Sequence, residues 1–457
     1  MAKMAIRPNE PASRAFCALK PTANTCRKLS SAHWVHIGGK RFTLRTKEVV
    51  VMRVHSRVSF WTVVVMLVLT VSMVASAQTR IPIGVLVPFT GAGAAEGPFL
   101  RNTVELAFEE IHEMLAAGGS DIRFQLVVED TATTPEGALA AIESLAAAGV
   151  QVVIGPYSSA ASSGVRGFAD ANKILVISPS ATSPALAIPN DYLFRLIVPD
   201  TLQGAAVSAL INREGYNRVV VFHRGDSYGA GMANAFKAVF EEQYGGTAFL
   251  LPYDPDLPDF AAEVQNLAQT VRRLGINNTA VLLVGFQPDG LNILGHARLD
   301  PTLTRVKWYG SKDAFSPVMY PPHAPEEISA FMASVNMTGA FPTPPQSPMR
   351  AIFEAKYRER YGETPSPWAL YMYDAAWIAA LSVLSAGEYN GEALREVARV
   401  IAARYIGASG HKMLDENDDA AIGDYEIMQA QAVDGTYAPV VIGMWSSGTG
   451  ELTLYND

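Results

Sequence analysis

Short apolar runs alternate with amphipathic stretches along the chain from residue 81 onward, and this alternation is typical of an α/β fold. Apolar residues recur with the 3.6-residue period of a helix from Leu100 to Leu115, and a second helix is expected at 138–148. The expected strands around them are 81–87, 122–128, 150–154 and 174–177. Strands and helices in this order predict a doubly wound parallel sheet.

The same alternation resumes after a connecting strand at 192–196, and it predicts a second parallel unit of the same kind. The expected strands are 218–222, 248–251, 280–284 and 306–309, and the expected helices are 201–213, 232–240 and 260–274. We further expect a return strand at 331–341, helices at 351–361, 368–384 and 394–404, and strands at 425–428 and 439–445. Two similar halves predict a cleft between them, with polar turns on both sides.

The helix expected at 368–384 is strongly apolar, and Asp374 is its only charged residue. It is short for a membrane span and lies within an otherwise polar part of the chain. We therefore expect it to be buried against the first sheet.

The apolar run 58–74 has the parts of a secretory signal peptide. Arg53 and Arg57 precede it, and Ala75-Ser76-Ala77 follows it as an A-x-A cleavage motif. We expect cleavage after Ala77 and interpret Met52 as the true start, because signal peptides are normally N-terminal. The alternative is that the segment is kept as a membrane anchor. No cysteine follows it, so a lipid anchor is not expected.

Cleavage at this point changes the charge of the chain considerably. Removing the 12 basic and 2 acidic residues of positions 1–77 from the totals of 36 and 44 leaves 24 and 42, a net charge of −18. Such a charge disfavours binding to nucleic acids and anionic membranes. Both cysteines, Cys17 and Cys26, are also removed. Their loss excludes disulfides, thiolate metal sites and cysteine nucleophiles from the mature protein.

Hydroxyl-rich turns follow two successive strands of the first unit. Ser158 and Ser159 stand where a helix begins after the strand 150–154, and the segment 178–184, SPSATSP, follows the strand 174–177. Both turns should lie at the carboxyl edge of one sheet, where open α/β sheets hold their ligands. Helix starts with free N–H groups and hydroxyls can bind a small anion, most simply a carboxylate. The alternative is that these residues only cap helices and shape turns.

Three other features of the sequence resemble functional sites but do not predict one. The turn 91–97 is not a G-x-G-x-x-G dinucleotide motif, because Glu96 replaces the third glycine and would face a pyrophosphate. The segment 415–419, DENDD, lacks the glycine and closing glutamate of a calcium loop and is predicted to be a solvated turn. His223 lies near the expected cleft, but no hydrolase motif occurs in the turns, so catalysis is not predicted. No cofactor is expected.

The chain resembles the type I periplasmic binding proteins, in the leucine/isoleucine/valine-binding branch that serves ABC importers. The matching segments are IPIGVLVPFTG at 81–91, LVVEDTATTPEGA at 126–138, VVIGPYSSA at 152–160, VISPSAT at 176–182, FRLIVPD at 194–200, SYGAG at 227–231, YDAAWIAA at 373–380 and ASGHKMLDENDD at 408–419. The resemblance implies two α/β lobes joined by a three-stranded hinge. Lobe 1 would comprise 78–198 and 338–408, and lobe 2 would comprise 199–337 and 409–457. The hinge crossings would lie near 195–200, 337–341 and 407–412.

The resemblance also implies a binding site between the lobes. Its ligand-binding residues would be Tyr157, Ser158, Ser159, Ser180, Ala181, Thr182, Tyr228, Phe286, Gln287 and Asp313. Ser159, Ser180 and Thr182 match the carboxylate pocket of the family, and Tyr228 matches its aromatic lid. The acidic residue that pairs with a ligand ammonium matches Asp313, but Lys312 is one position away and would oppose an ammonium.

The implied function is an exported solute-binding protein without catalytic activity. It would capture a small ligand, first of all a branched-chain or similar amino acid, and deliver it to the permease of an ABC importer. The alternative ligands are amides, urea, and aromatic or aliphatic carboxylic acids, bound for import or for a sensor. A sensor ectodomain of the same fold would need a membrane helix and a cytoplasmic domain after residue 457.

Overall fold

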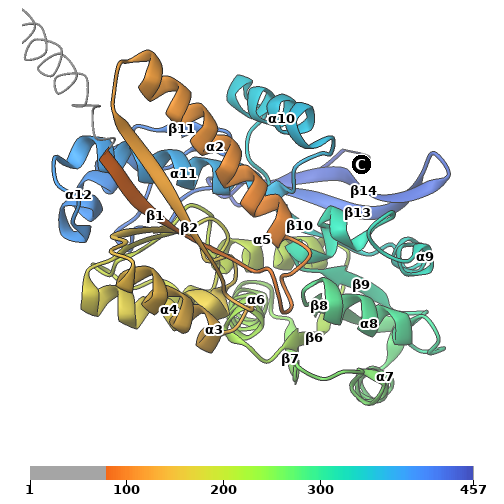
Figure 1. Cartoon of the computed structure of the whole chain (residues 1–457). Helices are drawn as coiled ribbons and strands as arrows, with labels where there is room; N and C mark the ends of the chain where they lie inside the picture. The colour runs from red at the N-terminus through yellow and green to blue at the C-terminus, as the bar shows by residue number, and fades with distance from the viewer. Residues whose placement is uncertain (1–78, 456–457) are drawn as a thin grey trace, which may run out of the picture. The chain divides into compact units, whose positions relative to one another are not determined.

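A computed structural model of the chain describes residues 79–455 (Figure 1). The expected signal peptide, its cleavage after Ala77 and the alternative membrane anchor lie outside the described residues.

The first sheet has five parallel strands in the order β2-β1-β3-β4-β5. The strands are β1 (Thr79–Val87), β2 (Ile122–Asp130), β3 (Val152–Ile154), β4 (Leu175–Ser178) and β5 (Leu193–Arg195). Strand order reverses between β1 and β3, so β2 lies on one side of β1 and the later strands lie on the other. This is the doubly wound arrangement that the sequence predicted.

Helices from two distant parts of the sequence surround this sheet (Figure 1). They are α2 (Gly97–Ala117), α3 (Pro135–Ala147), α4 (Ser159–Asn172), α10 (Pro348–Tyr361), α11 (Pro367–Ala386) and α12 (Gly391–Ala402), with the short 3-10 helix η1 (Pro184–Leu186). Helix α11 packs against α2, β3 and β4, which confirms the prediction that it is buried on the first sheet. Among the described helices it alone is long and apolar enough to cross a membrane, but 72% of it is buried within the protein.

The second sheet has eight strands in the order β15-β14-β13-β10-β9-β8-β6-β7. Its strands are β6 (Arg218–Arg224), β7 (Thr247–Tyr253), β8 (Thr279–Val284), β9 (Lys307–Gly310), β10 (Thr338–Pro342), β13 (Tyr425–Val433), β14 (Thr436–Trp445) and β15 (Leu452–Leu454). Strands β6 to β10 are parallel and repeat the order of the first sheet, as predicted. The last three strands extend the sheet in antiparallel fashion.

The second sheet carries its own set of helices. They are α5 (Asp200–Arg213), α6 (Ser227–Tyr244), α7 (Ala261–Leu274), α8 (Gln287–Ala297) and α9 (Glu326–Ser334), with the 3-10 helices η2 (Ile276–Asn278), η3 (Lys312–Phe315) and η4 (Pro317–Met319). A two-stranded ladder of β11 (Ile406–Gly407) and β12 (Gly410–His411) lies outside both sheets. The chain passes between the sheets after β5, after β10 and after β12. We propose that the lobe boundaries lie at these three crossings.

The return strand predicted at 331–341 is wrong in its first half. Helix α9 continues to Ser334, and only β10 is a strand. Ile328, Phe331 and Met332 are all buried, and their spacing places them on one face of a helix. The prediction followed the apolar content of the segment and overlooked this helical period.

The strands predicted at 425–428 and 439–445 are longer in the structure and form a hairpin. Asp434 and Gly435 connect β13 to β14 with positive φ angles of 49° and 82°. Two successive residues with positive φ make the tight turn whose twist matches antiparallel strands, and Asp-Gly is a favoured sequence for it. The Asp-Gly pair was the signal in the sequence that would have predicted the hairpin.

The segment 415–419 is a turn, as predicted, but only its first three residues are in contact with solvent, and Asp418 and Asp419 are buried. Asp419 pairs with Arg195 of β5, and both side chains are 1% exposed. Asp418 is fully buried and receives hydrogen bonds from Arg395 and Arg399 of α12. The carboxylates are buried because the fold brings arginines from distant segments to them, and paired charges can be removed from water.

Candidate functional site

The two hydroxyl-rich turns of the first sheet are joined by their side chains. The Ser158 hydroxyl caps α4 by accepting the N–H of Ala161 at 3.1 Å. The Ser159 hydroxyl accepts the N–H groups of Thr182 and Ser183, both at 3.1 Å. Ser158 and Ser159 therefore cap a helix and shape a turn, which was the alternative to ligand binding. They also fix the position of Thr182 beside the start of α4.

The neighbouring residues of these turns are buried as well. The Ser180 hydroxyl donates a 2.7 Å hydrogen bond to the carbonyl of Tyr157, which holds one turn against the other. Ala181 is fully buried, and its N–H is donated to the Ser178 hydroxyl. Ser180 and Tyr157 line a small cavity between the edges of the two sheets, and Ala181 does not.

The second sheet contributes the buried cation Lys312, which begins η3 directly after β9. Its ammonium donates hydrogen bonds to the Thr182 hydroxyl and to the Asp200 carboxylate, both at 3.0 Å. The Lys312 residue is only 4% exposed, and its ammonium also lies 4.0 Å from the centre of the Tyr228 ring. The family match left open whether Lys312 or Asp313 faces the site, and both line the same cavity.

Asp313 is held by the aromatic residue predicted as the lid. The Tyr228 hydroxyl donates a 2.5 Å hydrogen bond to Asp313 and lies 3.1 Å from the Ser311 hydroxyl. Burial raises the pKa of the Asp313 carboxyl, and the neighbouring Lys312 ammonium and the Tyr228 hydroxyl oppose that rise. Asp313 is therefore a buried carboxyl with a direct partner, placed beside a cation.

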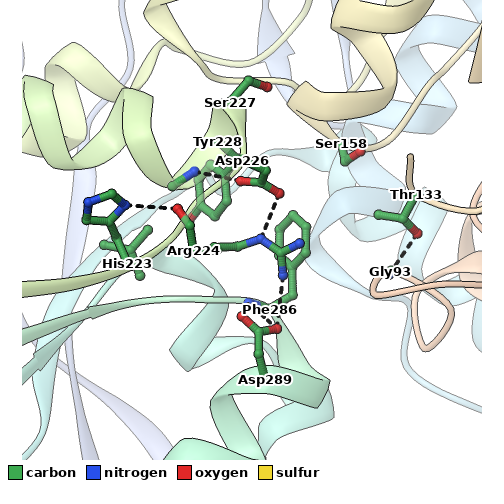
Figure 2. Close-up of polar contacts among 12 residues, drawn as sticks. Gly93, Thr133, Ser158, His223, Arg224, Asp226, Ser227, Tyr228, Phe286 and Asp289 are labelled. Carbon is green, nitrogen blue, oxygen red and sulfur yellow. Dashed lines mark hydrogen bonds and ion pairs between the residues drawn. The ribbon is translucent and has the colours of Figure 1, made fainter. Parts of the chain in front are cut away.

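Two aromatic side chains of the second sheet, Tyr228 and Phe286, line the same site as these polar groups and are drawn in Figure 2. The rings of Tyr228 and Phe286 stack with centroids 5.2 Å apart and planes 5° from parallel. The Arg224 guanidinium lies 4.2 Å from the centre of the Phe286 ring and pairs with Asp226 and Asp289. These ion pairs fix the guanidinium, and the guanidinium fixes the ring that faces the site.

The facing residues enclose a cavity of about 10 Å³, which is close to the space of one water molecule. It is lined by Tyr157, Ser158, Ser159, Ser180, Thr182, Tyr228, Phe286, Lys312, Asp313 and Trp368. Eight of the ten predicted site residues are thus brought together with Lys312 and Trp368. Any ligand larger than water requires the two sheets' edges to separate before it can enter.

A second cavity of about 10 Å³ shares three walls with the first, namely Tyr157, Phe286 and Asp313. Predicted Gln287 lines this second cavity, and its side-chain amide donates to the carbonyl of Val318 at 2.7 Å. Glu96 also lines this cavity, although the sequence indicated only that Glu96 disfavours a nucleotide site.

Trp368 and Lys312 were absent from the predicted set for different reasons. Trp368 lies in the first turn of α11, and the apolar pattern of this helix gave no sign that one of its residues lines a cleft. Lys312 is adjacent to the predicted Asp313, but the direction of the Lys312 side chain depends on the 3-10 turn of η3.

Two other features lie away from this site. His223 is buried with its Nδ1 on the carbonyl of Arg224 at 2.9 Å, and burial lowers its pKa (Figure 2). It does not line either small cavity. A larger cavity of about 380 Å³ lies at the crossings between the sheets, where Leu196, Pro344 and Lys412 are among its lining residues. It contains none of the predicted site residues.

Comparison with known proteins agrees with this architecture. A profile of the periplasmic binding protein family matches residues 80–436. An uncharacterized protein from Methanocaldococcus jannaschii is 26% identical over 401 residues, covering 84% of this chain and 94% of that protein. A leucine-, isoleucine-, valine-, threonine- and alanine-binding protein from Pseudomonas aeruginosa is 24% identical over 361 residues, which cover 77% of this chain and 90% of that protein. A solved ABC transporter solute binding protein from Rhodopseudomonas palustris, in complex with 3,4-dihydroxybenzoic acid, has a TM-score of 0.65 at 19% identity, covering 80% and 98%.

Proposed function

The chain belongs to the periplasmic binding protein family, and from this premise we propose that it captures a small carboxylate-bearing solute for the permease of an ABC importer. The predicted resemblance to the leucine/isoleucine/valine-binding branch is confirmed. Members of the family bind solutes and do not catalyse reactions, so the protein is a binding protein and not an enzyme. Family members act in the periplasm or outside the cell.

The single observation that carries the proposal is the contact between Lys312 and Thr182. Two hydroxyl-rich turns of the first sheet face a buried ammonium from the second, inside an aromatic enclosure. A carboxylate entering between them would receive hydrogen bonds from the ammonium and the Thr182 hydroxyl. Charge-assisted bonds of this kind offset the water that the anion loses.

Two ligand classes fit this site, and they differ in the use of Asp313. An α-amino acid would place its ammonium against Asp313, which matches the predicted ligand class and the Pseudomonas relative. An acid without an amine would use Lys312 alone and leave Asp313 bonded to Tyr228. The position of Lys312 at Thr182 supports the second class, as does the aromatic acid bound by the Rhodopseudomonas protein.

A ligand screen on the exported protein tests the proposal. The melting temperature is measured against branched-chain amino acids, amides, urea, and aromatic and aliphatic acids. A ligand that binds only the folded state stabilises it by about 2.7 kcal/mol at a hundredfold excess over Kd. Carboxylates should stabilise the parent, whereas their matched amides should not. A flat response to every carboxylate would contradict the proposal.

We also propose that the protein is exported and begins near Gln78, following the A-x-A motif at Ala75-Ser76-Ala77. N-terminal sequencing of material from the periplasm or medium checks this directly. Recovery of a protein that keeps residues 58–74 in the membrane fraction would favour the anchored alternative.

Closure between the two sheets is the third part of the proposal. The small size of the cavity means that ligand entry requires an open form, and a ligand that contacts both sides favours the closed one. X-ray scattering should show a smaller radius of gyration with ligand than without it. An unchanged radius at saturation would indicate a rigid pocket.

A further inference from the structure

Glu96 occupies the start of α2, but its side chain does not cap that helix. It stands at the N-cap position with no side-chain hydrogen bond to the helix. The loop before it is held in place, because the N–H of Gly93 is donated to the Thr133 hydroxyl at 2.9 Å (Figure 2). At the next position a Cβ on Gly97 would lie 2.4 Å from the Pro88 carbonyl, so the start of the helix packs tightly on the loop. The direction of the Glu96 side chain is therefore determined by the packing of the loop and not by a capping hydrogen bond.

The carboxyl of Glu96 faces the second sheet and is only partly satisfied there. Its Oε1 accepts a 2.9 Å hydrogen bond from the Ser316 hydroxyl, which follows η3. Its Oε2 is buried and has no hydrogen-bond partner among residues 79–455, and Glu96 is 3% exposed. A buried carboxyl oxygen without a hydrogen bond is costly, and this oxygen can accept a hydrogen bond from a donor placed in the cavity. Burial raises the pKa of Glu96 to about 7, although the nearby Ser366 and Ser316 hydroxyls act against the rise.

Glu96 lines the second small cavity, which adjoins the one containing Lys312 and Thr182. The two cavities share the walls formed by Tyr157, Phe286 and Asp313. The combined site thus has a cation and hydroxyls in one part, two aromatic rings and the Asp313 carboxyl in the shared part, and the Glu96 acceptor in the other. A solute that fills it when the sheets separate meets three different chemical environments.

We propose that Glu96 is a specificity-determining residue of the binding site, and that it selects carboxylic acids carrying a hydroxyl or amino donor away from the carboxylate. The ligand carboxylate lies at Lys312 and Thr182, its apolar body lies between Tyr157 and Phe286, and its distal donor bonds to Glu96 Oε2. This inference rests on the proposed function and extends it from a carboxylate to a bifunctional acid. A donor-free acid of the same shape leaves the buried oxygen without a partner and is rejected for that reason.

Matched pairs of acids test the assignment by calorimetric titration of the exported protein at about pH 8, above the Glu96 pKa of about 7, so that the carboxyl is mostly ionised. The probes are 4-hydroxybenzoate with benzoate, and 5-aminovalerate with valerate, and leucine is added as an acid without a distal donor. The parent should bind the donor-bearing member of at least one pair about ten- to a hundredfold more tightly, because a hydrogen bond to a charged group is worth about 1.5–3 kcal/mol. Glu96→Leu should abolish this preference and leave the Kd of the donor-free acid unchanged or lower.

Two variants keep the test decisive. Glu96→Gln retains the shape and an amide oxygen, and it should reduce the preference by about tenfold because the acceptor loses its charge. It serves as the main variant if Glu96→Leu does not fold. Glu109→Gln on the same helix is the control, because the Glu109 side chain is 49% exposed and pairs with Arg360 at the surface, away from both cavities. It should leave every Kd unchanged.

The possible results separate this inference from the function on which it rests. If the parent bound both acids of each pair with equal affinity, the role of Glu96 would be overturned and carboxylate capture would stand. Binding of leucine and of none of the other acids would have the same consequence. If Glu96→Gln weakened the binding of both acids of a pair equally, Glu96 would only support the fold. This result would also overturn its role in specificity. Failure of every acid to bind would overturn both proposals.

Discussion

The Lys312 ammonium donates a 3.0 Å hydrogen bond to the Thr182 hydroxyl, and the two residues come from the edges of different sheets. The same ammonium pairs with Asp200 in the first turn of α5. Lys312 therefore joins the edges of the two sheets, and in the proposed function it also binds the anionic group of the ligand. Substitutions at Lys312 and its partners separate these two roles.

Replacing Lys312 with Met should weaken binding of a carboxylate ligand and also destabilise the protein. The substitution leaves the Asp200 carboxylate, which is 1% exposed, without its counter-charge. Removal of one partner of a buried pair costs about 3–5 kcal/mol. Urea unfolding measures the stability, and calorimetric titration measures the affinity.

The double variant Lys312→Met with Asp200→Asn is the control for that change. Neutralising Asp200 removes the buried unpaired charge, so most of the lost stability should return. Ligand affinity should stay low, because no cation faces the carboxylate. Recovery of affinity together with stability would show that Lys312 acts only through the fold.

Thr182→Ala should weaken binding of a carboxylate by about ten- to a hundredfold, since the variant loses a hydroxyl that bonds a charged group. The N–H of residue 182 would still be held by Ser159, so the turn itself should keep its shape. Thr182→Ser retains the hydroxyl and should bind within about threefold of the parent. Equal loss in both variants would place the effect in the missing methyl group.

Asp313→Asn should distinguish the two proposed ligand classes. If the ligand is an amino acid, affinity should fall by a hundredfold or more, that is by about 3–5 kcal/mol, because a buried ammonium loses its counter-charge. If the ligand has no amine, affinity should change little, because Asp313 then stays bonded to the Tyr228 hydroxyl and makes no contact with the ligand. Tyr228→Phe is the companion variant, since it removes that hydroxyl and keeps the stacked ring.

Stability should fall as pH rises because of Glu96. Burial raises the pKa of its carboxyl from 4.5 to about 7, so the folded protein holds the proton more tightly than the unfolded chain. Between these values folding takes up a proton, and the free energy of unfolding decreases with pH until about pH 7. A shift of this size corresponds to at most about 3 kcal/mol.

The groups around Glu96 determine how this prediction is measured. Asp313, Tyr157 and Tyr357 interact electrostatically with it, so the useful quantity is the difference between parent and Glu96→Gln from pH 4.5 to 8. The variant should show a flatter dependence. Burial also raises the pKa of Asp191 to about 7, and Asp191→Asn shows how much of the remaining slope it contributes. Identical slopes in parent and Glu96→Gln would contradict the assignment.

Much of the candidate site was predictable because the turns after parallel strands must meet at one edge of a sheet. Ser158, Ser159 and Thr182 follow β3 and β4, and Tyr228 follows β6, so their elements alone place them near the cleft. What each side chain does there was not predictable. The Ser159 hydroxyl holds two backbone N–H groups, and that role depends on the distance between two turns that lie 23 residues apart.

The sequence by itself determined the two doubly wound units, the burial of α11 and the edge of each sheet where a ligand would lie. These properties follow from the local periodicity of apolar residues and from the geometry of parallel strands. Only the folded chain shows which charged and polar side chains are buried together. Lys312 meets Thr182, Glu96 meets Ser316 and Asp419 meets Arg195 across 130, 220 and 224 residues. Pairing at such separations depends on how the sheets and their connections pack, and no local pattern of the sequence records it.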